Sequence, residues 1–130
     1  MVFPYIVSSK VSKMDLAAEF PNLDQFIGCY FHQDWTIDAE ERGDITHPDY
    51  AILHAFKDVN AAYLLAIKED IDKLLARQYT EVKLLQIIED EFCGNINPSL
   101  DGLTMQRWLE HVCQMINDAL LGFGSSRLPR

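Results

Sequence analysis

The feature that most constrains the fold is an apolar stripe with helical spacing near the C-terminal end of the sequence. After Thr104, apolar side chains recur every three or four residues: Met105, Trp108, Leu109, Val112, Ile116, Ala119 and Leu120. Polar side chains fall on the opposite face: Arg107, Glu110, Gln114 and Asp118. This period is typical of an amphipathic α-helix that buries one side. Strand signals are almost absent, so other helices must cover the stripe.

Further segments have the same period and begin with residues that can cap a helix. The first expected helix starts near Pro21 with Asn22 as its cap, and it carries an apolar face made of Leu23, Phe26, Ile27 and Tyr30. Thr46 is the expected cap of the next helix, Asn60 marks a bend or a new helix, and Thr80 caps another that Gly94 stops.

The stripes of these later helices are expected to be Tyr50, Leu53, Phe56 and Val59, then Leu64, Ile67, Ile71 and Leu74 or Leu75, then Leu84, Leu85, Ile88 and Phe92. Lys68, Glu69, Asp70 and Lys73 are expected to face water. Since each helix has one apolar face, the stripes can bury one another. We therefore expect an all-α fold, a compact single-domain bundle of about five helices.

A chain of 130 residues is long enough for one independent core. We expect a flexible N-terminal extension over residues 1–13, a helical domain over 14–121 and a flexible tail over 122–130. The three cysteines (Cys29, Cys93 and Cys113) are widely spaced and show no disulfide or metal-binding pattern. The sequence also lacks a secretory signal and a long apolar segment, so we expect a cytoplasmic protein without a membrane partner.

The charge of the chain is concentrated in its first half. The net charge is -9, and residues 15–58 hold ten acidic side chains against two basic ones. Such a surface repels nucleic acid and suits a basic protein partner. The densest part is a run after residue 33, made of Asp34, Asp38, Glu40, Glu41, Asp44 and Asp49. The run is either a solvated loop that keeps the protein soluble or part of an interface.

Histidine–carboxylate pairs raise the possibility of a metal-dependent hydrolase built on His32, Asp34, His54 and Asp58. Only His54 and Asp58 have the i, i+4 spacing that places both groups on one helix face. None of the pairs forms a recognised zinc pattern, and no nucleophile motif or phosphate-binding loop is present. We expect no enzyme, no catalytic residue, no metal, no cofactor and no small-molecule substrate.

The segment Tyr30-Phe31-His32-Gln33-Asp34-Trp35 ends the first expected helix, and it resembles the immunity proteins of bacterial contact-dependent growth-inhibition systems. The resemblance extends over about residues 15–120. It implies a small, mostly helical cytoplasmic protein that binds and neutralises the toxic C-terminal domain delivered by a neighbouring cell. An unrelated acidic adaptor protein is the main alternative.

The resemblance also implies roles for particular residues. The motif residues Tyr30, Phe31, His32, Gln33, Asp34 and Trp35 are expected to hold the fold, with Trp35 in the core and Asp34 or His32 bound to the backbone of the turn. Toxin contacts are expected between residues 36 and 49. The candidates are Asp38, Glu40, Glu41, Asp44 and Asp49, whose charge fits a basic nuclease domain as the cognate toxin.

Overall fold

The computed structural model describes residues 16–125, and these residues form helices and connecting turns without a strand. The elements are α2 (Pro21–Tyr30), α3 (Trp35–Arg42), α4 (Pro48–Asp58), α5 (Ala61–Ala76), α6 (Glu81–Gln86), the π-helical turn η1 (Ile87–Glu91), the 3-10 turn η2 (Pro98–Asp101) and α7 (Met105–Ser125). Residues 16–19 are also helical. The expected all-α class is confirmed, whereas about five helices is too low a count for this part of the chain.

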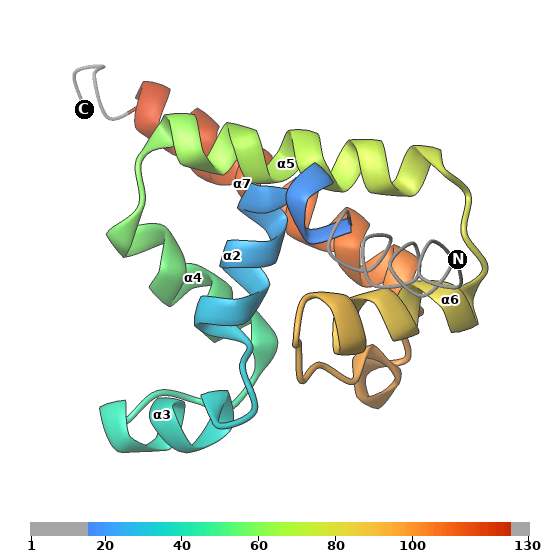
Figure 1. Cartoon of the computed structure of the whole chain (residues 1–130). Helices are drawn as coiled ribbons and strands as arrows, with labels where there is room; N and C mark the ends of the chain where they lie inside the picture. Colours follow the sequence, from blue (N-terminus) through green and yellow to red (C-terminus); the bar gives the residue numbers. More distant parts are fainter. Residues whose placement is uncertain (1–15, 126–130) are drawn as a thin grey trace, which may run out of the picture.

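The long helices α5 and α7 pack against each other, and α2 packs across α5 (Figure 1). From α5, α2 leads away to α3, which lies at the end of the molecule farthest from α5 (Figure 1). The core between these helices is aromatic and aliphatic, and its largest fully buried side chains include Trp108, Phe26 and Phe31. None of the helices in residues 16–125 combines the length and apolar character that crossing a membrane requires.

The N-terminus of α2 is capped by a carboxylate from another helix. Its N-cap residue, Phe20, makes no side-chain capping bond. Instead, the backbone N–H groups of Asn22 and Leu23 donate to Oδ2 of Asp70, over 2.9 and 3.0 Å. Two expectations were therefore wrong. Asn22 lies inside the helix rather than at its cap, and Asp70 is buried, 5% exposed, rather than facing water. An acceptor from α5 replaces the local cap because α2 starts against that helix.

The expected start of α4 is also shifted by one residue. His47, not Thr46, is the N-cap, and its Nδ1 accepts the N–H of Asp49 over 3.1 Å. The buried face of α4 is Ala51, Ile52 and Ala55. The expected stripe was wrong at Tyr50 and Leu53, which are about half exposed. Two of the three buried residues are alanines, so the large side chains of Tyr50 and Leu53 did not mark the buried face.

The caps of the later helices agree with the expectations. Asn60 starts a new helix, since its Oδ1 accepts the N–H of Tyr63 over 2.8 Å. The expected cap Thr80 accepts the N–H of Lys83 in the same way. Thr104, which was expected only as the start of the last helix, accepts the N–H of Arg107. α7 continues to Ser125. The expected N-terminal extension and the rest of the expected tail lie outside the described residues.

The chain leaves η1 through a tight reversal at Cys93 and Gly94. Cys93, rather than Gly94, adopts the left-handed conformation, with φ of 58°. Gly94 is buried and donates its N–H to the carbonyl of Ile88 over 2.8 Å. A Cβ at this position would lie 2.6 Å from Cγ2 of Ile27 and 2.9 Å from Cγ2 of Ile88. Glycine is therefore needed for close packing between α2 and η1.

Candidate functional site

The acidic segment after Trp35 is a helix, α3, and not a solvated loop. Trp35 and Ala39 form its buried side. Ile37, Glu40 and Glu41 are spaced i, i+3 and i+4, which places them on one face, and all three are exposed. Ile37 is 53% exposed. We call these three residues the outer face of α3: an isoleucine beside two carboxylates, turned away from the core.

Aromatic packing holds α3 on the body of the protein. Phe31 is fully buried, and its ring lies 5.4 Å from the rings of both Trp35 and Trp108, in edge-on contacts. Trp35 is 7% exposed, so its expected place in the core is confirmed. Edge-on aromatic pairs add stabilisation to the burial of the rings themselves. The motif thus fixes the position of the acidic helix.

Asn95 connects the same region to the turn after η1. Its carbonyl accepts the indole N–H of Trp35 over 2.7 Å, and its own N–H donates to the carbonyl of Phe31 over 2.7 Å. Its side-chain amide donates to the carbonyl of Gln33 over 3.1 Å. The sequence marks Asn95 only as part of a turn, because its partners lie about 60 residues earlier. It joins both ends of the motif to the body of the protein.

His32 links the motif to the acidic helix. Its Nδ1 accepts the backbone N–H of Asp34 over 3.1 Å, so the expected bond to the turn backbone is confirmed for His32. Its Nε2 lies 2.9 Å from Oδ2 of Asp38. The ring therefore binds an N–H group of the turn and a carboxylate of α3. With Nδ1 as acceptor, Nε2 is the donor to Asp38.

The five candidate contact residues fall into two groups. Asp38 binds His32, Asp44 binds Nε of Arg42 over 3.0 Å, and Asp49 binds Nε2 of His111 over 2.9 Å. Glu40 and Glu41 make no ion pair with another described residue. Side-chain partners in the turn before α3, on α3 and on α7 thus bind three of the carboxylates, and the outer face of α3 carries the other two.

The residues of the hydrolase alternative are not assembled into one site. His32 and His54 line a cleft of about 140 Å³ between α2, α3 and α4, whereas Asp34 and Asp58 do not. Within residues 16–125, no three His, Cys, Asp or Glu side chains are placed to hold a metal ion. Burial raises the pKa of the Cys113 thiol to about 12, so this thiol is protonated at neutral pH and is a poor nucleophile.

Comparisons with known proteins agree with this architecture. The family model described as CdiI immunity protein matches residues 19–116. A chain in the crystal structure of a CdiA-CT/CdiI complex from Y. kristensenii 33638 is similar, with a TM-score of 0.68 and 22% sequence identity. The match covers 78% of this chain and 96% of that chain. A search of the curated proteins found no match. At 22% identity the structural likeness concerns the fold alone.

Proposed function

The chain belongs to the CdiI immunity protein family, and from this premise we propose that it binds and neutralises the C-terminal toxin domain of a contact-dependent growth-inhibition system. The family match over residues 19–116 is the observation that carries the proposal. The similar chain comes from a CdiA-CT/CdiI complex, which supports a toxin domain as the partner. On this proposal the protein acts in the cytoplasm, where the toxin would reach its target.

Neutralisation is proposed to be stoichiometric, by covering or distorting the active site of the toxin. The described residues offer a charged surface and no cluster of His, Cys, Asp or Glu side chains placed to hold a metal ion. Between Asp34 and Asp44 there are five carboxylates and one guanidinium, that of Arg42, so this segment has a net charge of -4. A basic partner surface would relieve the repulsion among these carboxylates. A nuclease domain, which must bind phosphates, fits this requirement.

We place the first contacts on the outer face of α3. Ile37 supplies exposed apolar area, and Glu40 and Glu41 supply charge on the same helix face. Among the other candidates, Asp38, Asp44 and Asp49 contribute to the field while binding His32, Arg42 and His111. Interfaces commonly combine an apolar centre with a charged rim. The outer face of α3 has this composition.

Growth rescue tests the proposed function. The toxin domain encoded directly upstream should stop growth when expressed alone, and co-expression of this protein at near-equimolar levels should restore growth. Chelator should have no effect on inhibition of the purified toxin, because inhibition depends on occupancy. Rescue at strongly substoichiometric levels, or no rescue at all, would rule the proposal out.

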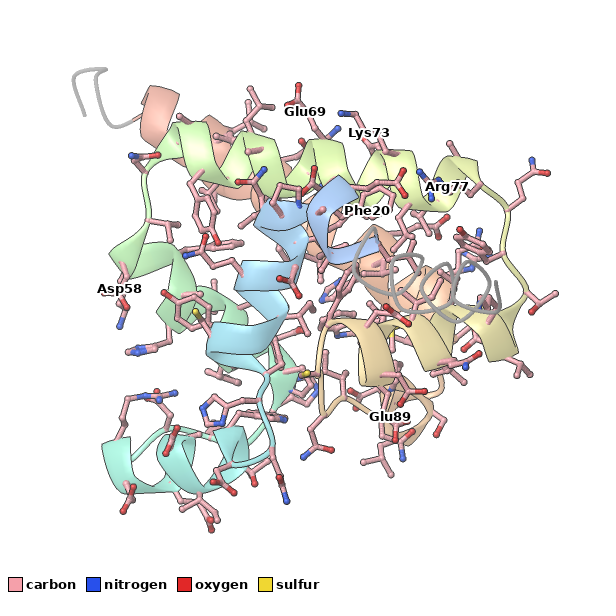
Figure 2. The ribbon with its side chains drawn as sticks, viewed as in Figure 1. Phe20, Asp58, Glu69, Lys73, Arg77 and Glu89 are labelled. Atoms are coloured by element: carbon pink, nitrogen blue, oxygen red, sulfur yellow. The ribbon has the colours of Figure 1, made fainter. Side chains whose placement is uncertain are left out.

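A charge-reversal pair tests the proposed surface. Glu40→Lys with Glu41→Lys should slow association with the toxin domain by about tenfold or more at low salt, since opposed charges steer encounter. The control is Glu69→Lys with Asp72→Lys on α5, which changes the net charge equally. Figure 2 shows Glu69 on the outer edge of α5, away from α3. If both double variants associate at the same rate, only net charge matters and α3 is not the contact.

A further inference from the structure

A groove beside Trp35 brings together three segments that are far apart in the sequence. It has a volume of about 160 Å³ and lies between the start of α3, the start of α4 and η2. Its lining includes the apolar side chains of Trp35, Pro48 and Leu100, together with His47 and Asp101. We call it the Trp35–Leu100 groove. It combines apolar walls with one carboxylate.

Leu100 forms part of this lining without a role in the core. It is 82% exposed, although η2 is anchored by the buried Pro98 two residues earlier. The turn is also closed by backbone bonds from Leu100 to Asn97 and from Gly102 to Ser99. The fold therefore holds a large apolar side chain in water at a fixed place. A single exposed leucine is ordinary on a protein surface, but this one lines a groove with a tryptophan and a carboxylate.

Asp101 is positioned by a histidine. Nε2 of His47 lies 3.0 Å from Oδ2 of Asp101, while Nδ1 of the same ring accepts the N–H of Asp49 and lies 4.0 Å from Oδ1 of Asp49. The ring donates to Asp101 through Nε2 and so fixes the orientation of this carboxylate. Asp101 therefore lines the groove as an oriented carboxylate.

We propose that the Trp35–Leu100 groove holds a lysine or arginine side chain of the toxin domain. This inference rests on the proposed function and names a contact within it. Lysine and arginine have long aliphatic stems that pack on apolar surface, with a cationic end that seeks a carboxylate. The groove offers both partners, and the acidic α3 beside it attracts cations. An apolar side chain would take water away from the Asp101 carboxylate without offering it a cation or a hydrogen-bond donor in return, which is unfavourable.

Dissociation of the complex with the toxin domain tests the groove. Asp101→Asn keeps the shape of the side chain and removes its charge, and it should speed dissociation on the order of 30-fold. Leu100→Ser removes apolar wall and should speed dissociation about tenfold. Asp101→Lys should bind the toxin domain more weakly than Asp101→Asn does, because lysine places a positive charge next to the incoming cation. Hydrogen exchange of residues 97–102 should slow in the wild-type complex.

Two matched variants serve as controls. Glu69→Gln removes a carboxylate on α5, and Leu121→Ser removes an exposed leucine, 69% exposed, near the end of α7. Thermal melts of the free variants establish that each is folded. If Asp101→Asn and Leu100→Ser dissociate at the rates of the two controls, the groove inference is overturned while the proposed function stands. Tighter binding by Asp101→Asn would mean an apolar occupant and would also overturn it. Absence of binding by the wild type would overturn the proposed function itself.

Discussion

Replacing Asp70 by alanine should destabilise the protein by removing the cap of α2. Oδ2 of Asp70 accepts the N–H groups of Asn22 and Leu23, and Phe20 offers no alternative cap. Leu23 is fully buried, so its N–H would lose its partner away from water, at a cost of about 1–3 kcal/mol. Asn22 is half-buried and its N–H can find water, so the lost cap there costs about 1 kcal/mol. The sum is about 3 kcal/mol.

Thermal and urea unfolding of three variants would measure this effect. Asp70→Ala should lower Tm on the order of 10 °C. Asp70→Asn retains an oxygen acceptor and loses only the charge, so its loss should be about 1 kcal/mol. The neighbouring Glu69→Ala is exposed and should change stability by less than about 0.5 kcal/mol. A Tm for Asp70→Ala within about 2 °C of the wild type would refute the capping argument.

Three further changes test other parts of the account. Trp35→Ala should cost about 3–5 kcal/mol in urea unfolding, since it removes a buried ring, and an unchanged midpoint would mean that Trp35 is not in the core. Gly94→Ala should lower the free energy of unfolding by about 1–3 kcal/mol, because the added Cβ overpacks the contact between α2 and η1. Gly28→Ala is the control, since its Cβ would meet no atom closer than 3.9 Å, and equal destabilisation by the two changes would contradict the packing role of Gly94. The hydrogen bond from Arg77 lowers the pKa of Glu19 below its ordinary 4.5, so the Tm advantage of the wild type over Glu19→Gln should be full at pH 7 and should shrink steadily as the pH is lowered below 4.5. A Tm advantage that does not change as the pH falls would show that protonation of Glu19 does not affect stability.

Local signals in the sequence predicted the helices whose ends are fixed by local bonds. Asn60, Thr80 and Thr104 each cap a helix through an N–H only three residues away. These caps depend on near neighbours, so the order of residues is sufficient to find them. The burial of Trp35 was instead implied by the family resemblance that its motif carries.

Other features depend on residues that are distant in the sequence. The cap of α2 comes from Asp70, 47 residues after Leu23, and a surface-like aspartate with lysines nearby gives no sign of that role. The fixing of α3 by Asn95 is of the same kind. α3 was not expected as a helix, because only Trp35 and Ala39 face inward and the other positions, rich in carboxylates, give no apolar period.

The candidate site was predictable as a region but not as a set of residues. The acidic run indicated the region, because the density of acidic residues can be counted in the sequence. Which candidates have a partner depends on the fold, since Asp49 binds His111, which lies 62 residues later on α7. The groove beside Trp35 is made by three separate segments, and no spacing in the sequence indicates it.

Titration of the purified toxin domain with this protein tests the central claim most directly. Toxin activity should fall in proportion to the amount of protein added and reach zero at one molecule per toxin domain, with a 1:1 complex in light scattering. This result is expected because the proposed inhibition acts by occupancy. Activity that disappears at a small fraction of an equivalent would indicate turnover. Activity that persists beyond several equivalents, without a complex, would contradict the account.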